Sequence, residues 1–142
     1  MKIKAISLKQ PWANLVRDGF KTIETRKWAT TYRGEILICS SLQPDKDALA
    51  LYGPHADRFP GHSPITAEPA GMALCIAELY DCRKMTRADE RRALCHVYPN
   101  AHSFFLRNIR KIEPFPVKGQ LGIFEVEIER VTLIQEVKFN RN

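Results

Sequence analysis

A lysine, a glutamate and an arginine lie within six residues of one another in the segment GFKTIETR, as Lys21, Glu24 and Arg26. The two tryptophans of the chain, Trp12 and Trp28, flank them. Cations hold anionic groups, a carboxylate accepts hydrogen bonds from an amine, and an indole can stack on a planar ring. These residue types together favour a cleft that binds a polar, planar and anionic ligand.

The alternation of polar and apolar residues from 22 to 28 is typical of a half-buried β-strand. Successive side chains of a strand point to opposite faces. One face is then expected to carry Thr22, Glu24, Arg26 and Trp28, and the other Ile23 and Thr25. Lys21 is expected at the mouth of this strand, just past a turn at Gly19.

A purely structural role for the same residues is the alternative. A glutamate and an arginine two positions apart on an exposed strand contribute little to stability as a pair. Trp12 and Trp28 bury enough area to belong to the core. The residue types alone therefore leave a ligand site and a solvated strand face both open.

The spacing Gly19-x-Lys21-x-x-Glu24-x-Arg26 resembles the GxKxxExR signature of ASCH domains, named for activating signal cointegrator homology. Four further blocks resemble the branch that includes the C-terminal domain of the cointegrator itself, namely SLKQPWA at 7–13, YRG at 32–34, DC at 81–82 and FPVKG at 115–119. The similarity runs from about residue 6 to about residue 127. It implies a PUA-like barrel, an architecture used in RNA-modifying enzymes and RNA-binding modules.

The resemblance and the charge pattern together define the candidate ligand-binding residues, which are Gln10, Trp12, Lys21, Glu24, Arg26, Trp28, Arg33 and Lys118. The function favoured is binding of RNA or another single-stranded nucleic acid, in transcription or translation regulation. The cations would contact phosphates and a tryptophan would stack on an unpaired base. Glu24 would accept a hydrogen bond from an exocyclic amine or orient the two cations. A protein-interaction module is a third hypothesis, which the residues do not test.

The alternative function is that of an amidohydrolase acting on N4-acetylcytidine or a related modified nucleoside. Some small ASCH proteins use a lysine-activated threonine as the nucleophile, with a carboxylate nearby. Lys21 matches that lysine, but Glu24 stands where the threonine is expected, and Thr22 or Thr25 would have to replace it. Lys21 and Glu24 are the catalytic candidates in this case. A carboxylate next to a lysine favours the ammonium form and opposes its use as a base, so binding ranks above catalysis.

The charge of the chain is basic, with 22 Lys and Arg against 16 Asp and Glu and a net charge of +6. An excess of this kind favours a polyanionic partner, because neutralised phosphates release counterions. One group of cations surrounds the signature, at Arg17, Lys21, Arg26, Lys27 and Arg33. Two others, at Arg83, Lys84, Arg87, Arg91 and Arg92 and at Arg107, Arg110 and Lys111, are interpreted as solvated surface.

The four cysteines and four histidines show no metal-ligand spacing. Cys39 and Cys75 lie in apolar runs and are expected to be reduced core thiols. We expect no metal and no cofactor. With 142 residues, 44% of them hydrophobic, and no apolar run of transmembrane length, residues 1–142 are predicted to form a single cytoplasmic domain without membrane contact.

Six segments have the pattern of a strand, at residues 2–8, 22–28, 34–40, 71–80, 102–112 and 124–129. Short helices are expected from Pro11 to Gly19, over 45–52, and over 86–95, where Thr86-x-x-Asp89 resembles a capping box. Residues 53–69 read as a long proline-rich loop. We therefore predict an α+β fold, a small mixed β-barrel of about six strands with two to three short helices, of the PUA-like type that the ASCH resemblance implies.

Overall fold

The chain forms seven β-strands and three short α-helices over the residues that the computed structural model describes, which are 1–54, 59 and 66–136. The strands are β1 (Lys2–Leu8), β2 (Ile23–Arg26), β3 (Gly34–Ser40), β4 (Met72–Lys84), β5 (His102–Pro116), β6 (Ile123–Glu127) and β7 (Leu133–Glu136). The helices are α1 (Trp12–Arg17), α2 (Lys46–Tyr52) and α3 (Glu90–Ala93), and a 3₁₀ turn, η2 (Arg87–Asp89), precedes α3. The predicted α+β class is confirmed.

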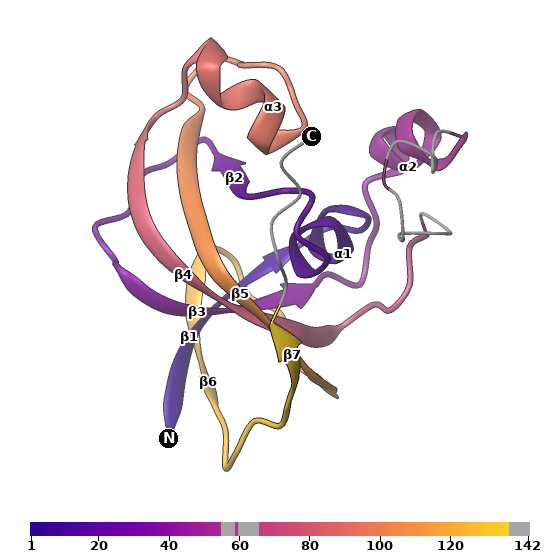
Figure 1. Cartoon of the computed structure of the whole chain (residues 1–142), viewed down its shortest axis with the longest axis vertical. Helices are drawn as coiled ribbons and strands as arrows, with labels where there is room; N and C mark the ends of the chain where they lie inside the picture. Colours follow the sequence, from indigo (N-terminus) through magenta and orange to yellow (C-terminus); the bar gives the residue numbers. More distant parts are fainter. Residues whose placement is uncertain (55–58, 60–65, 137–142) are drawn as a thin grey trace.

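All seven strands belong to one mixed sheet with the order β2-β5-β4-β3-β1-β6, and β7 pairs with β5. β1 and β3 run parallel, with Ala5 beside Leu37, and every other pair is antiparallel. The sheet curls into half of a barrel, as Figure 1 shows. This arrangement matches the small mixed barrel expected from the sequence, and β2 stands at one end of the strand order.

β4 and β5 are the longest strands and bend the sheet. Their ladder shifts register three times, the first shift falling between Ala73 and Cys75. A bulge bends a strand and increases its twist, so the two strands curve while they stay paired. The sequence pattern ends these strands at residues 80 and 112, whereas they run to Lys84 and Pro116. The prediction followed the apolar part of each segment, whereas the pairing continues beyond it, with Lys84 beside His102 and Met72 beside Pro116.

Three further elements differ from the prediction. β2 ends at Arg26, so the strand does not reach residue 28. β7 was not predicted. The helix expected over 86–95 is divided into η2 and α3, and α3 ends early because Leu94 adopts the left-handed conformation with a φ of 58°. The capping contact predicted at its start is present, since Thr86 N donates to Asp89 Oδ2 at 3.0 Å.

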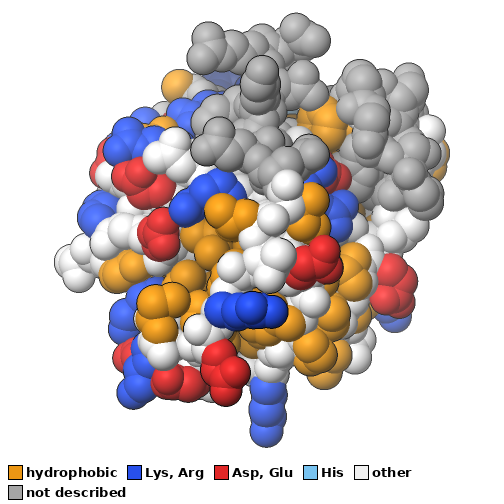
Figure 2. Space-filling view, turned by 60° about the horizontal axis from the view of Figure 1, so that its bottom comes forward, with side chains coloured by type: hydrophobic (Ala, Val, Ile, Leu, Met, Phe, Trp, Pro, Cys, Tyr) orange, Lys and Arg blue, Asp and Glu red, His pale blue; other side chains and the backbone are white. Residues whose placement is uncertain are grey.

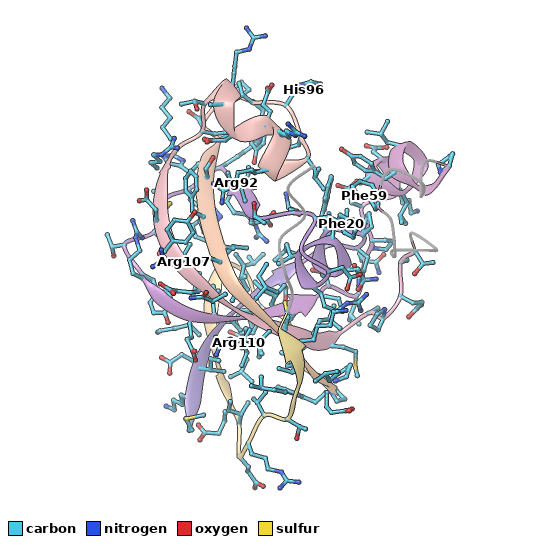
Figure 3. All side chains as sticks on the ribbon, in the orientation of Figure 1. Phe20, Phe59, Arg92, His96, Arg107 and Arg110 are labelled. Atoms are coloured by element: carbon cyan, nitrogen blue, oxygen red, sulfur yellow. The ribbon has the colours of Figure 1, made fainter. Side chains whose placement is uncertain are left out.

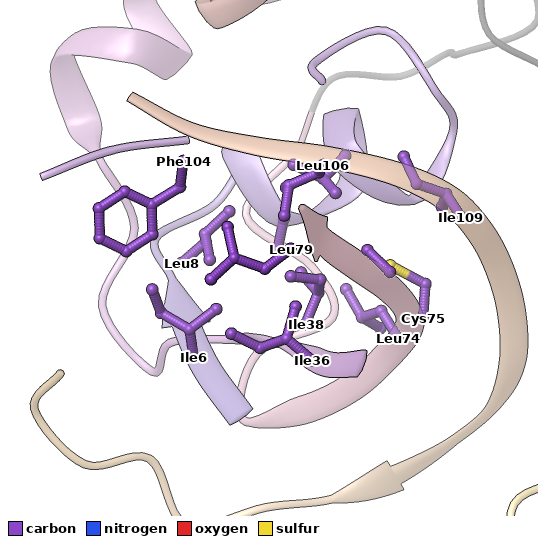
Figure 4. Close-up of a cluster of buried hydrophobic side chains, with 13 residues drawn as sticks. Ile6, Leu8, Ile36, Ile38, Leu74, Cys75, Leu79, Phe104, Leu106 and Ile109 are labelled. Carbon is purple, nitrogen blue, oxygen red and sulfur yellow. The ribbon is translucent and has the colours of Figure 1, made fainter. Parts of the chain in front are cut away.

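β3 lies in the middle of the sheet and is buried on both faces. Ile36 and Ile38 belong to the larger core cluster, which Figure 4 shows. Leu37 and Cys39 belong to a second cluster on the other face. Burial on both sides explains why the sequence of this strand is almost continuously apolar. Burial also raises the pKa of the Cys39 thiol to about 12, as expected of a core cysteine.

α1 packs against the curled sheet and links β1 to β2 (Figure 1). Its Ala13 and Val16 pack in the larger core cluster, and Leu15 packs with Tyr52 and Phe59. Gly19, with a φ of 84°, lets the chain turn out of the helix, since a positive φ suits glycine. The packing of α1 therefore fixes both Trp12 at its start and the chain that leads into β2.

Figure 2 shows one face of the molecule, on which hydrophobic side chains gather between side chains of both charge signs. Positive and negative side chains are mixed on the visible part of this face, which is therefore not a patch of one charge sign. None of the described helices is long and apolar enough to cross a membrane. Most of the loop expected over residues 53–69 lies outside the described residues.

Candidate functional site

A cleft of about 450 Å³ opens among β1, the start of α1, β2 and the segment that follows α3. Its volume falls in the range of roughly 300–1,000 Å³ that is usual for small-molecule sites. The cleft brings together four of the sequence-predicted residues, Trp12, Lys21, Glu24 and Arg26. The other residues that line it are Ser7, Lys9, Thr25, Ser41, Asp45, Cys95, Tyr98, Gln120, Leu121 and Gly122.

Glu24 is held between two cations. Its Oε2 accepts from Arg26 Nε at 3.0 Å and lies 2.9 Å from Arg26 Nη2, while its Oε1 lies 3.6 Å from Lys21 Nζ. Arg26 Nη2 also donates to the backbone oxygen of Ser7 at 2.8 Å, which ties β2 to the end of β1. Arg26 and Glu24 are only 23% and 11% exposed, so this group is a semi-buried ion pair network rather than a solvated strand face.

Lys21 is almost completely buried, with 2% of its side chain exposed. Its Nζ donates to the backbone oxygen of Ala93 at 2.5 Å and lies 4.8 Å from the centre of a Trp12 ring. A cation at this distance from an indole is attracted by the ring electrons. The carbonyl, the carboxylate of Glu24 and the indole all stabilise a positive charge at this position.

Asp45 holds the Trp12 indole in place. Trp12 Nε1 donates to Asp45 Oδ2 at 2.9 Å, and Asp45 Oδ1 accepts from Ala48 N at 3.0 Å as the N-cap of α2. Burial acts to raise the pKa of Asp45, but these two hydrogen bonds and the charge of Lys9 outweigh it, and the pKa is lowered. One carboxylate therefore links the aromatic wall of the cleft to the start of α2.

Gln10 supports the cleft from the core and does not line it. Its side chain is fully buried, and Nε2 donates to Asn14 Oδ1 and to the backbone oxygen of Pro69, both at 2.9 Å. Its Oε1 accepts from Asn14 N at 3.0 Å. Its backbone oxygen accepts from Asp45 N at 2.8 Å. These contacts position the start of α1, and with it Trp12.

Thr25 and Tyr98 form a second polar wall. The Tyr98 hydroxyl donates to Thr25 Oγ1 at 2.9 Å, and Cys95 Sγ lies 3.8 Å from the same oxygen. Burial raises the pKa of Tyr98, although the bond to Thr25 opposes the shift. Thr25 thus lines the cleft beside Glu24, although strict alternation places the two on opposite faces.

Ser7 brings an unpaired hydroxyl to the cleft. Among the described residues, Ser7 Oγ is a buried side-chain oxygen without a hydrogen-bond partner. A Cβ added to Gly119 would lie 2.7 Å from it, so only glycine lets the chain approach so closely there. The glycine of the FPVKG block therefore packs on the cleft-lining serine.

Four other residues singled out in the sequence lie away from the cleft. Trp28 packs on Phe104 in the core, with ring centres 5.1 Å apart. Arg33 donates to backbone oxygens at residues 30 and 32 and pairs with Asp81 at 3.7 Å. Lys118 is exposed and is not a lining residue. Thr22 precedes β2, and its Oγ1 accepts from Arg92 Nε at 2.9 Å.

A second cavity of about 710 Å³ adjoins the cleft, and the two share Trp12, Asp45 and Cys95. Its other lining residues are Asp47, Ala48, Leu51, Tyr52, Glu90, Arg91, Leu94 and His96. Within the described part of the chain, no group of three or more His, Cys, Asp and Glu side chains is arranged to hold a metal ion.

The comparison with protein families identifies the family of the chain. The ASCH domain family model matches residues 6–116, so the chain belongs to the ASCH domain family. Among curated proteins, the chain is similar to activating signal cointegrator 1 from Mus musculus and from Homo sapiens, at 27% identity over 133 residues in each case. The match covers 86% of this chain but only 22% of either relative.

Solved structures show the same fold. The crystal structure of ASCH from Zymomonas mobilis aligns with a TM-score of 0.59 at 15% identity, over 89% of this chain and 88% of that chain. A single-residue mutant of the same protein aligns with a TM-score of 0.56 at 14% identity, over 89% of this chain and 91% of that one. At this level of identity the likeness concerns the fold alone.

Proposed function

We propose that this ASCH domain binds single-stranded nucleic acid, with RNA as the favoured ligand, and holds one unpaired base in the cleft. The observation that carries the proposal is the position of Glu24, which two cations hold beside Trp12 in a partly closed cleft. Membership of the ASCH family supports it, because RNA binding is the role generally assigned to these domains.

The polar groups of the cleft suit the edge of a nucleobase. A carboxylate accepts several hydrogen bonds, so Glu24 keeps acceptor capacity for an exocyclic amine beyond its two cationic partners. The hydroxyls of Ser7 and Thr25 add donors and acceptors at the same wall. Unpaired bases are usually read by such contacts on their Watson–Crick edge.

The charges and the aromatic wall suit the rest of a nucleotide. Lys9 is exposed at the cleft and Arg26 is partly exposed, so both can approach a phosphate. Trp12 offers an aromatic surface, and base stacking on such a ring contributes about 1–3 kcal/mol per base. Arg33, Trp28 and Lys118 lie outside the cleft and have at most a peripheral part in this proposal.

Hydrolysis of N4-acetylcytidine is the second candidate, supported by a buried lysine and a hydroxyl in one cleft. Thr25 is the hydroxyl in question, because Thr22 is bonded to Arg92 outside the cleft. Lys21 Nζ, however, donates to Ala93 O and lies 3.6 Å from Glu24 Oε1, so its contacts are with a carbonyl and a carboxylate rather than with the hydroxyl that it would have to activate. Binding without turnover is therefore the function that we favour.

Two measurements on the purified protein test the choice. Fluorescence anisotropy with labelled 12-nucleotide oligocytidylate, repeated at several salt concentrations, should show binding that weakens steeply as salt rises. Incubation with N4-acetylcytidine should release no cytidine at any pH at which the protein is folded. Absence of salt-sensitive binding overturns the proposal, and turnover that depends on Lys21 reverses the ranking.

A further inference from the structure

Arginines and aromatic rings alternate on the face of the sheet that lies opposite Glu24. The Arg83 guanidinium lies 4.5 Å from the centre of the Phe105 ring, and that of Arg92 lies 5.4 Å from the same ring. Arg107 lies 4.4 Å from the centre of the Tyr80 ring. Arg92 Nη2 donates to the Tyr80 hydroxyl at 3.1 Å and joins the two stacks. We call these five residues the arginine–aromatic array.

The register of β2 and β5 sets the face on which the array lies. Glu24 is paired with Phe104, and Ile23 is paired with Phe105. Directly paired residues share a face and successive residues alternate. Phe104 therefore points to the same face as Glu24, where it packs in the larger core cluster. Phe105 points to the other face, where it packs with Ile23, and the arginines stacked on Phe105 lie on that face too. Figure 3 shows Arg92, which belongs to α3, and Arg107, which lies farther along β5.

The array lies in a cationic part of the chain. Residues 78–111 contain eight Lys and Arg against four Asp and Glu, a net charge of +4. Arg83 pairs with Asp89 at 3.3 Å and Arg107 with Glu78 at 2.8 Å. The Arg92 guanidinium donates hydrogen bonds to hydroxyl groups, and no carboxylate partner is found for it in the described part of the chain. The middle of the array therefore carries a charge that is not neutralised.

The stacked geometry suits phosphate. A guanidinium stacked on a ring keeps its edge N–H groups in a fixed plane, and such edges match phosphate oxygens. Arg83, Arg92 and Arg107 are all exposed, whereas Phe105 beneath two of them is only 5% exposed. The Phe105 ring thus orders two of the arginines and is itself covered, which favours contact with a charged backbone over stacking on bases.

The array begins one residue from the cleft. Arg92 Nε donates to Thr22 Oγ1, and Thr22 directly follows Lys21, which lines the cleft. β2 stands at one end of the strand order, so the two faces of the sheet meet along it. A nucleic-acid strand that leaves the cleft across β2 therefore reaches Arg92 without crossing another β-strand.

We infer that the arginine–aromatic array is a second contact site, which binds the phosphates of a single-stranded nucleic acid whose unpaired base occupies the cleft. This inference rests on the proposed function. It assigns binding to cations that the sequence pattern treats as solvated surface. It also requires that a longer oligonucleotide binds more tightly than a short one, since only the longer one spans both sites.

The test compares labelled oligocytidylates of 3 and 12 nucleotides by fluorescence anisotropy. In the double variant Arg92→Gln with Arg107→Gln, affinity for the 12-mer should fall about tenfold and the slope of log affinity against log salt should decrease by about 1.4, for two lost phosphate contacts on a single strand. Affinity for the 3-mer should not change. Arg130→Gln, at the turn between β6 and β7 far from α3 (Figure 1), is the matched control and should bind both as the wild type does.

The outcomes separate the two claims. If the wild type binds neither oligonucleotide, the proposed function itself fails. If the wild type binds but the double variant keeps full affinity for the 12-mer, or loses affinity for both lengths equally, the array is not a phosphate site. Arg92→Lys with Arg107→Lys, which keeps the charges, should restore most of the slope, and failure to do so at unchanged thermal stability also overturns the inference. If the wild type binds polyglutamate and the double variant does not, while the double variant keeps full affinity for the 12-mer, the array binds an acidic peptide instead.

Discussion

Arg26 contacts Glu24 through one carboxylate oxygen, with Nε at 3.0 Å and Nη2 at 2.9 Å from Oε2. The other oxygen faces Lys21 Nζ at 3.6 Å, so a single carboxylate orders both cations of the signature. Lys21 and Arg26, the two cations of GxKxxExR, are thus linked by the Glu24 carboxylate between them. Glu24 is in this way the residue on which the geometry of the cleft depends.

Replacement of Glu24 by glutamine should destabilise the fold more than replacement of Arg26 by glutamine. Glu24→Gln leaves the buried Lys21 ammonium without a countercharge, whereas the partly exposed Arg26 side chain is replaced by a neutral one. Removal of one partner of a buried pair costs roughly 3 kcal/mol or more. The free energy of unfolding in urea measures both variants. Equal effects would show that Lys21 does not depend on Glu24.

Arg26→Gln should weaken nucleic-acid binding and lower its salt dependence, because Arg26 lies in the cleft. For one lost contact with a single strand, the slope of log affinity against log salt should fall by about 0.7. Arg33→Gln removes the same charge from a residue outside the cleft and should change the slope much less. The reverse order of the two effects would move the binding site toward Arg33.

Asp45→Asn should lower both stability and ligand affinity, since Asp45 caps α2 and orients Trp12. Loss of an N-cap costs about 1 kcal/mol, and a weaker hold on the indole should add to the loss of affinity. Asp47→Asn, in the first turn of the same helix but without a contact to Trp12, is the control. Thermal unfolding and oligonucleotide titration of the two variants make the comparison. If Asp45→Asn and Asp47→Asn bind the oligonucleotide with the same affinity, the position of Trp12 does not affect ligand binding.

Asp89 should contribute a part of the stability that acid removes. Burial acts to raise its pKa, but hydrogen bonds from Thr86 N and Ser103 Oγ and the charge of Arg83 together lower it. A group with a lowered folded-state pKa stabilises the fold fully above its unfolded value of about 3.9 and loses that contribution as pH falls through the folded value.

The difference in unfolding free energy between the wild type and Asp89→Asn should therefore be largest near neutral pH and shrink below about pH 4. Urea unfolding from pH 7 to pH 3 measures it. A difference that grows toward acid would contradict the assignment.

Local patterns predict the central strands and the charged group of the site. β1 and β3 have the predicted bounds, because alternation and a two-sided apolar run both encode strands directly. Lys21, Glu24 and Arg26 meet because they lie within six residues of one another, which a short strand brings together. This part of the site is a local property of the sequence.

Long-range contacts complete the site and escape such patterns. Tyr98 reaches Thr25 from 73 positions away, and Asp45 reaches Trp12 from 33 positions away. No periodicity links those segments, although Asp45 has the residue type of a helix cap. Trp28 was predicted to bind the ligand but packs on Phe104 in the core. The sequence does not distinguish the two positions, because a tryptophan of the core and a tryptophan of a cleft occur in the same sequence pattern.

The two tryptophans allow a direct test of the central claim, that an unpaired base occupies the cleft beside Trp12. In Trp28→Phe, the only remaining indole lines the cleft, and in Trp12→Phe the only one packs on Phe104 in the core. Titration of both variants with 12-nucleotide oligocytidylate should quench the fluorescence of Trp28→Phe, since a base stacks near its indole, and leave that of Trp12→Phe unchanged. Binding that quenches only Trp12→Phe, or neither variant, would contradict the account.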